Sequence, residues 1–79
     1  MLQMRPGCER CDRDLPAGAG DAWICSFECT FCTPCVLGPL QHRCPNCGGE
    51  LQPRPSRVGD ALRRNPGSTK RVFRPPSTP

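Results

Sequence analysis

The stretch Cys25-Ser-Phe-Glu-Cys29-Thr-Phe-Cys32-Thr-Pro-Cys35 places four cysteines within eleven residues. It is preceded by Cys8-Glu-Arg-Cys11 and followed by Cys44-Pro-Asn-Cys47, so the eight cysteines of the chain form four close pairs. Pairs with a gap of two or three residues suit tetrahedral metal sites, because a short turn brings both sulfurs to one ion. The pattern therefore predicts two Zn²⁺ ions, each held by four thiolates.

The cysteine region is too short to fold on apolar burial alone. All eight cysteines lie between residues 8 and 47 of a 79-residue chain that has one Trp, three Phe and no Tyr. A unit of about 50 residues buries too little apolar surface to offset its chain entropy. Structural zinc, at roughly 10–16 kcal/mol in small finger peptides, is sufficient to stabilise such a unit. We therefore predict a small metal-stabilised α+β domain over residues 1–52.

Disulfide bonds are the alternative way to stabilise so small a unit, and they need an oxidising compartment. Residues 1–7 lack the apolar segment and cleavage site of a secretory signal. No run approaches the ~20 apolar residues of a membrane helix. We expect a cytoplasmic protein without a membrane partner, in which the cysteine pairs bind metal rather than one another.

Charge and proline content divide the chain. Residues 1–52 carry a net charge of −2 and residues 53–79 a net charge of +6, and six of the eleven prolines lie in the second part. Zinc-bound cysteines are thiolates, so the loaded domain is more acidic still. A basic, Pro-rich segment cannot bury enough apolar surface to order itself. We expect residues 53–79 to be a flexible, disordered tail that folding does not require.

Local signals place short elements around the cysteines. The alternation in residues 22–27 predicts a hairpin strand. Thr33-Pro34 predicts a short helix with Thr33 as N-cap and Pro34 in its first turn, limited by Gly38-Pro39. Gly48 supplies the permissive backbone needed after the last cysteine pair. In the tail, residues 58–62 have the spacing of one helical turn.

Four cysteine pairs can form two sites in three ways: neighbours together, outer pairs together, or alternate pairs together. We favour the alternate arrangement, a cross-brace, because an early knuckle plus two cysteines at a helix start makes a treble-clef site. The order and spacing of residues 8–47 also resemble those of the RING finger, with Cys29 where most members have His. The two predicted zinc sites are therefore Cys8, Cys11, Cys32 and Cys35 for the first and Cys25, Cys29, Cys44 and Cys47 for the second.

The RING resemblance supports a scaffold rather than a reaction. RING ubiquitin ligases usually carry an apolar residue before the second cysteine, an aromatic residue before the seventh and a basic residue soon after the eighth. Here these places hold Arg10, residues 40–43 (Leu-Gln-His-Arg) and the pair Gly48-Gly49. The partner-binding residues of the ligases are therefore absent.

A second resemblance covers about residues 1–52 and includes positions other than cysteine. The strings RPGCERCDRDLP, ICSFECTFCTPC and RCPNCGGEL are similar to those of a bacterial family of small Cys-rich proteins described only as a domain of unknown function. This resemblance implies a bacterial cytoplasmic protein and contributes no activity.

An iron–sulfur cluster is the alternative metal centre. Cys29, Cys32 and Cys35 copy the first three ligands of a bacterial ferredoxin run, but Pro39 stands where the fourth cysteine belongs. We expect His42 to be a surface side chain, because eight cysteines already complete two sites. We interpret Trp23, Phe27 and Phe31 as a small core rather than a base-stacking platform.

The sequence favours a non-enzymatic module that presents a small surface to a protein partner. Zinc with four thiolates has no open position for water, and the acidic residues Glu9, Asp12, Asp14 and Glu28 are interpreted as solvated charges. A nucleic-acid adaptor is a second hypothesis, and it would use the basic residues of the tail, namely Arg54, Arg57, Arg63, Arg64, Lys70, Arg71 and Arg74. A redox or zinc sensor is a third, and it needs at least one labile site.

Overall fold

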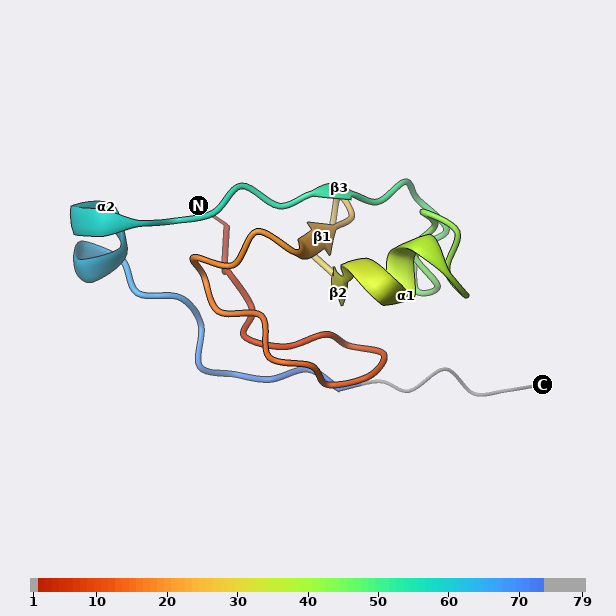
Figure 1. Cartoon of the computed structure of the whole chain (residues 1–79), viewed down its shortest axis with the longest axis horizontal. Coiled ribbons are helices and arrows are strands. Elements are labelled where there is room, and N and C mark those ends of the chain that lie inside the picture. The colour runs from red at the N-terminus through yellow and green to blue at the C-terminus, as the bar shows by residue number, and fades with distance from the viewer. Residues whose placement is uncertain (1, 74–79) are drawn as a thin grey trace.

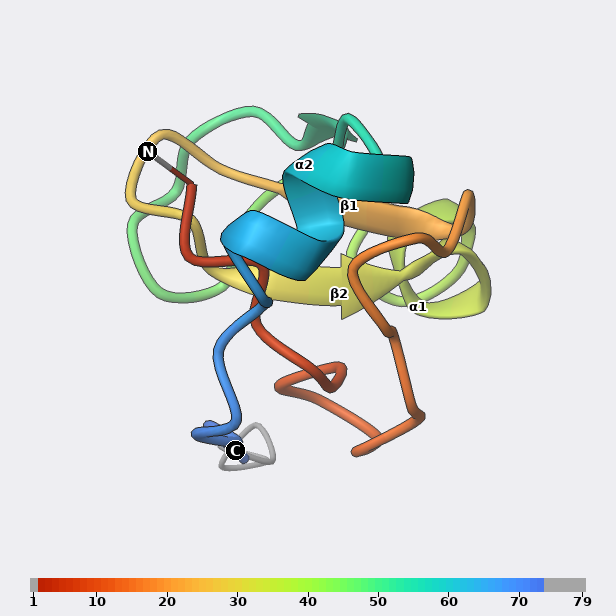
Figure 2. The same cartoon turned by 90° about the vertical axis from the view of Figure 1, so that its left-hand side faces the viewer.

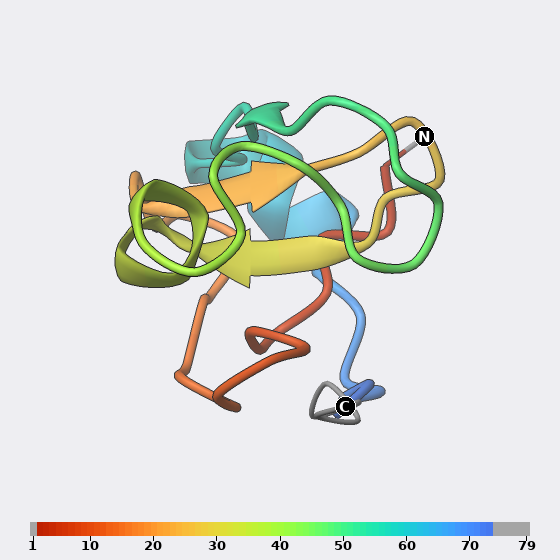
Figure 3. The same ribbon diagram turned by 90° about the vertical axis from the view of Figure 1, so that its right-hand side faces the viewer.

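The computed structural model describes residues 2–73 and contains a small antiparallel sheet with two short helices. The strands are β1 (Ala22–Ile24), β2 (Thr30–Cys32) and β3 (Gln52–Pro53), and they lie in the order β2-β1-β3. Figure 3 shows β1 and β2 running antiparallel, with β3 beside β1. The expectation of a small α+β domain with short hairpin strands is confirmed.

The hairpin strand is shorter than the sequence predicts. β1 ends at Ile24 instead of reaching residue 27, because Cys25 begins a tight turn in which its carbonyl accepts from the Glu28 N–H at 2.9 Å. Glu28 has a φ of 64°, which a continuous strand does not allow. As a consequence Phe27 lies on the turn with 72% of its surface exposed. Its assignment to the core was wrong.

Helix α1 (Thr33–Leu37) begins directly after β2 and has Gly38 as its C-cap, as the Gly38-Pro39 pair predicts. Its N-cap is Cys32 rather than Thr33. The Thr33 hydroxyl instead donates to the Asp21 carbonyl at 3.1 Å and accepts from the Trp23 indole N–H at 2.9 Å. The hydroxyl therefore joins α1 to the β1 region, and capping of the helix is left to the backbone.

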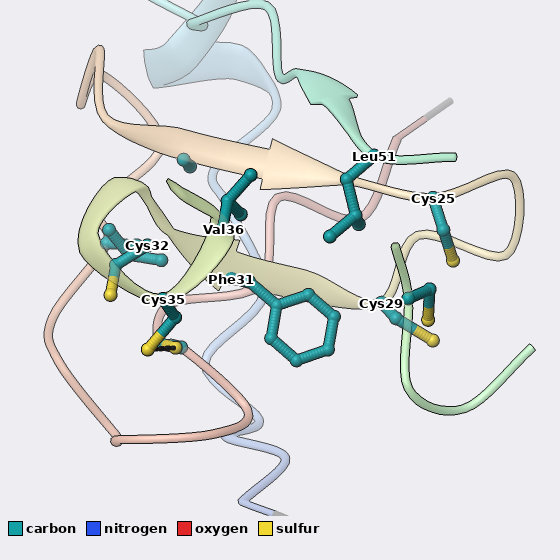
Figure 4. Packing of buried hydrophobic residues seen from close by; sticks show 11 residues of the cluster. Cys25, Cys29, Phe31, Cys32, Cys35, Val36 and Leu51 are labelled. Atoms are coloured by element: carbon teal, nitrogen blue, oxygen red, sulfur yellow. Dashed lines mark hydrogen bonds between the residues drawn. The ribbon is translucent and has the colours of Figure 1, made fainter. Parts of the chain in front are cut away.

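The core is one small cluster of buried side chains around Phe31. Phe31, Leu15, Leu51 and Val36 are each at most 1% exposed, and buried cysteines complete the cluster. Figure 4 shows the Phe31 ring between two groups of cysteines, Cys32 and Cys35 on one side and Cys25 and Cys29 on the other. A core with so few large side chains cannot offset chain entropy without another source of stability.

Residues 52–73 fold back along the N-terminal segment. Helix α2 (Gly59–Arg64) lies at the end of the molecule away from α1 (Figures 1 and 2). After it the chain returns beside residues 2–14, and the Ser68 N–H donates to the Gln3 carbonyl at 2.9 Å (Figure 1). The one helical turn expected from residues 58–62 is thus present as α2.

A buried arginine crosses the expected domain boundary at residue 53. The Arg54 guanidinium donates to the carbonyls of Arg5 at 2.8 Å and of Leu15 and Pro16 at 3.0 Å, and the residue is 4% exposed. The sequence allots Arg54 to the tail, yet its side chain closes the N-terminal loop. The flexibility of residues 53–79 stays a prediction, and residues 74–79 lie outside the described part. No helix within residues 2–73 has the length and apolar character required to span a membrane.

Candidate metal centre

The first cysteine cluster consists of Cys8, Cys11, Cys32 and Cys35, whose sulfurs all lie within 4.8 Å of one another. The Cys8 and Cys35 sulfurs are 3.8 Å apart, and the Cys11 and Cys32 sulfurs are 3.5 Å apart. A tetrahedron with Zn–S bonds of ~2.3 Å has edges of about 3.8 Å. The spacing of these sulfurs therefore fits one ion shared by four thiolates.

Three local structures build the first cluster. In the Cys8–Cys11 turn, the Cys8 carbonyl accepts from the Asp12 N–H and the Cys8 N–H donates to the Arg13 carbonyl, both at 2.8 Å. Asp12 has a φ of 63°, which lets the chain reverse after Cys11. Cys32 is the last residue of β2, and Cys35 stands in the first turn of α1. The strand-to-helix junction thus sets the separation of the second sulfur pair.

The second cysteine cluster consists of Cys25, Cys44 and Cys47, whose sulfurs also lie within 4.8 Å of one another. Its two turns aim backbone N–H groups at sulfur, which stabilises thiolate charge. The Asn46 N–H donates to the Cys44 sulfur and the Gly49 N–H to the Cys47 sulfur, each at 3.4 Å. Gly48 has a φ of 76°, so the permissive residue predicted at this position is needed there.

Cys29 is buried next to the second cluster but lies outside the set of mutually close sulfurs. Its carbonyl accepts from the Cys25 N–H at 3.2 Å, so the two backbones are held side by side. Burial raises the pKa of the Cys29 thiol, and the nearby Glu9 carboxylate also raises it. The predicted role of Cys29 as fourth ligand stays a prediction.

The two clusters join alternate cysteine pairs. The Cys8–Cys11 turn meets Cys32 and Cys35, while the Cys44–Cys47 turn meets Cys25, so the chain enters each cluster twice. All eight cysteines are free thiols in the structure. Sulfurs separated by 3.5–3.8 Å stand at the edge length of a shared metal site, well beyond the ~2 Å of a disulfide bond. The arrangement supports metal binding over the disulfide alternative.

The acidity of the thiols differs within each cluster. Burial raises the pKa of Cys32, and it raises the pKa of Cys44 to about 12. Burial acts in the same direction on Cys25, but hydrogen bonds to its sulfur, first that of the Phe27 N–H, lower its pKa below the ordinary value. Without metal, Cys32 and Cys44 are therefore protonated at neutral pH, and a metal ion that binds them must displace those protons.

A buried carboxylate stands between the clusters, and sequence reasoning missed it. Glu9 is 1% exposed, although its acidity and its place in a turn suggest a solvated charge. Its carboxylate accepts from Arg5 Nη1 and from the Thr30 N–H, both at 2.8 Å, and from Asn46 Nδ2 at 3.3 Å. The one available signal is Arg5, four residues earlier, which forms an ion pair with Glu9.

Several basic residues expected to be free are engaged inside the molecule. Arg54 is buried, and Arg57 donates to the carbonyls of Leu2 and Asn65. Arg71 pairs with Asp12 at 3.0 Å and with Asp14 at 2.9 Å, which lie around the first cluster's turn. Arg63 pairs with Asp60 on α2, and Arg74 lies outside the described residues. The basic charge of residues 53–73 is thus partly used to hold the chain together.

A hollow of about 240 Å³ is lined by Gln41, His42, Arg43 and Glu50. His42 is exposed, as expected, and its ring meets the edge of Trp23 with centroids 5.5 Å apart. The metal-type ligands that the described residues bring together are the two sulfur clusters.

Comparison with known proteins agrees with the small Cys-rich family that the sequence resembles. An uncharacterized protein of Rhizobium meliloti (strain 1021) is 57% identical over 75 residues, which cover 95% of this chain and 89% of that protein. No solved structure matches the chain. A family model with the description "Protein of unknown function (DUF1272)" matches residues 1–57, so the match extends past the buried Arg54. The chain therefore belongs to the DUF1272 family.

Proposed function

We propose that this protein is a two-zinc, RING-like cross-brace module that acts as a protein-interaction adaptor without catalysis. The observation that carries the proposal is the interleaving of two sulfur clusters built from alternate cysteine pairs. Each cluster needs cysteines that are distant in sequence, so metal binding would hold together segments that the small core cannot hold. Structural zinc sites contribute folding energy in this way.

The cysteine grouping supports zinc over an iron–sulfur cluster. The ferredoxin-like reading needs Cys29, Cys32 and Cys35 on one cluster. In the structure Cys32 and Cys35 instead lie with Cys8 and Cys11, and Cys29 lies across Phe31 beside Cys25 (Figure 4). We propose Cys29 as the fourth ligand of the second zinc ion, because it is buried and its carbonyl accepts from the N–H of the ligand Cys25.

The proposed absence of catalysis rests on the ligand chemistry. Four thiolates close the coordination sphere of zinc and leave no position for a water molecule or a substrate. Binding of a protein partner is supported by large apolar side chains left in solvent: Phe27 at 72% and Leu37 at 58% exposure adjoin the clusters, and Val58 and Phe73 are exposed in the later part of the chain. Phe27 stands on the turn of the second cluster, and Leu37 ends α1 beside the first.

The metal content of the protein tests the proposal directly. Protein purified without added metal should contain two zinc ions per chain by elemental analysis and should be colourless. Substitution with Co²⁺ should give the intense absorption of tetrahedral thiolate sites. Stoichiometric iron with charge-transfer bands, or a metal-free protein with the same fold, would contradict it.

The adaptor role needs a separate test. We would compare the proteins retained by the wild type with those retained by Phe27→Asp and Leu37→Asp variants that keep both zinc ions. We expect a specific partner to be retained by the wild type but not by at least one of these two variants. The control variant Glu50→Gln, a change at an exposed residue, should still retain that partner. Equal retention by every variant would argue against an adaptor surface at Phe27 or Leu37.

A redox or zinc sensor is a second candidate function, favoured by the exposure of one cysteine in each cluster, Cys11 and Cys47. An exposed thiolate is the one that a mild oxidant reaches first. Release of zinc at low peroxide, slowed by Cys47→Ser in a variant that still binds the metal, would support this role. A nucleic-acid role draws less support, because Arg54, Arg57 and Arg71 are engaged in internal contacts.

A further inference from the structure

The Glu9 carboxylate joins the turns of the two cysteine clusters. In the chain Glu9 lies between Cys8 and Cys11, so its backbone belongs to the turn of the first cluster. Its Oε1 accepts from Asn46 Nδ2 at 3.3 Å, and Asn46 lies between Cys44 and Cys47. The backbone N–H of Asn46 meanwhile donates to the Cys44 sulfur at 3.4 Å. A continuous path of contacts thus leads from one cluster to the other.

The other partners of Glu9 come from two further segments. Its Oε2 accepts from Arg5 Nη1 and from the Thr30 N–H, both at 2.8 Å. Its own N–H donates to the Thr30 carbonyl at 2.9 Å, so the turn is also fixed to β2. Of the seven acidic residues, Glu9 alone is buried.

A buried carboxylate is costly unless all of its partners are in place. Desolvation of an ion costs several kcal/mol in real proteins, and only well-placed hydrogen bonds and charges offset that cost. The partners of Glu9 meet when both cysteine turns have their native geometry. Ordering one turn by metal therefore places the carboxylate where it favours the native geometry of the other turn.

We propose that Glu9 is a positioning residue that couples the two metal sites, so that zinc in one cluster raises the zinc affinity of the other. This inference rests on the proposed function, because it requires both clusters to bind metal. Within residues 2–73 the Glu9 carboxylate makes no hydrogen bond to a cysteine sulfur; its charge lies near Cys29, and its hydrogen bonds reach the clusters through Asn46 and Thr30. The coupling is reciprocal, because it is a free energy shared between two sites. Coupling of this kind typically changes affinity by about 5- to 150-fold.

The test measures the zinc affinity of each cluster separately. Fully loaded protein is titrated with a chelator, and the Cβ chemical shifts of the cysteines report by NMR which cluster releases its metal. Asn46→Ala removes the contact from the exposed side of the path. We expect it to weaken zinc binding at the first cluster about tenfold, although Asn46 belongs to the turn of the second. Glu9→Ala, a change in the turn of the first cluster, should lower the zinc affinity of the second cluster.

Two further variants separate coupling from local damage. The first is the double variant Glu9→Ala/Asn46→Ala. If the Glu9–Asn46 hydrogen bond carries the coupling, the zinc affinity of each cluster in this variant is no lower than in the single variants, because the second substitution has no hydrogen bond left to break. Glu50→Gln removes a carboxylate charge whose oxygen accepts from the Gln52 amide and not from the cluster turns. It should leave both affinities unchanged.

The contrary results are distinct. Asn46→Ala protein that binds two zinc ions and releases the first-cluster metal at the wild-type chelator concentration overturns the coupling while leaving the proposed function intact. A double variant whose losses simply add also overturns it. Wild-type protein whose cysteine shifts show thiols in either cluster overturns the proposed function itself. If Glu9→Ala does not fold, the outcome for Asn46→Ala decides the matter.

Discussion

The two cysteine clusters use the same residue type but reach different degrees of convergence. In the first cluster, four sulfurs meet within 4.8 Å, and the pair Cys32 and Cys35 is carried by β2 and α1. In the second, three sulfurs meet, all carried by turns and loops, and Cys29 lies just outside. In the first cluster the strand-to-helix junction sets two of the four sulfurs, whereas the second cluster depends on turns and loops alone.

The clusters also differ in the side-chain hydrogen-bond donors at their sulfurs. Arg10 Nη1 donates to the Cys35 sulfur at 3.7 Å in the first cluster. Backbone N–H groups donate to sulfur in both clusters, and in the second that of Phe27 lies 3.3 Å from the Cys25 sulfur. A backbone donor is held by the turn itself and adds no side-chain entropy cost, so the turns of the second cluster are themselves part of the ligand environment.

Removal of all metal should have the largest effect and should abolish the difference between the clusters. The core around Phe31 is too small to stand alone, so complete chelation should unfold residues 8–47. Loss of dispersion in the amide NMR spectrum measures this. Retention of a dispersed, native-like spectrum by verified metal-free protein would show that the core suffices.

Single ligand replacements should separate the clusters. Cys32→Ser removes a sulfur of the converged first cluster, and we expect the loss of one zinc ion and a destabilisation of more than about 4 kcal/mol. Cys29→Ser tests the fourth ligand of the second cluster and should also lower the metal content by one. Denaturant unfolding and elemental analysis of both variants check this. An unchanged metal content in Cys29→Ser would restrict the second site to three thiolates.

Acidification should release the metal from both clusters. Proton and metal compete for the same thiolate, and burial raises the pKa of Cys32 and raises that of Cys44 to about 12. Zinc affinity should therefore fall as the pH falls, and each proton taken up per released ion contributes about tenfold per pH unit. A pH titration with a zinc indicator dye measures the slope, and a pH-independent affinity between pH 8 and pH 5 would contradict thiolate ligation.

The Arg54 side chain should matter for the fold more than its place in a basic tail suggests. Arg54→Ala leaves the carbonyls of Arg5, Leu15 and Pro16 without their donor in a buried place. We expect a loss of about 2–4 kcal/mol in unfolding free energy of the loaded protein. Arg54→Lys keeps the charge but not the planar fork, so it should recover part of the loss. Equal stability of Arg54→Ala and wild type would place the domain boundary before residue 54.

The exposed Arg71 pairs should have the smallest effect. Arg71 contacts Asp12 and Asp14 beside the first cluster, but exposed ion pairs contribute little and are screened by salt. Arg71→Ala should therefore lower the melting temperature less than Arg54→Ala and should leave the metal content at two zinc ions. Loss of first-cluster zinc in this variant would show that the returning segment supports that cluster.

Much of the local structure could be predicted because it depends on neighbours in sequence. The paired spacing of the cysteines indicates metal sites, Gly38-Pro39 ends α1 and Gly48 takes the positive φ that its turn requires. The end of β1 at Ile24 was missed, because the alternation of residues 22–27 continues into a turn where the pairing with β2 stops. The alternation of apolar residues does not show at which residue the hydrogen bonds between two strands end.

The sequence by itself determined that the eight cysteines form four close pairs, because a gap of two or three residues fixes which cysteines can share one turn. Only the tertiary structure decided which turns meet and what lies between them. The sequence predicts Glu9 as a solvated charge and Arg54 as part of a flexible tail, but each is buried with partners from distant segments. The burial of an ion depends on donors and acceptors that converge only after the chain has folded, so composition and spacing do not reveal it.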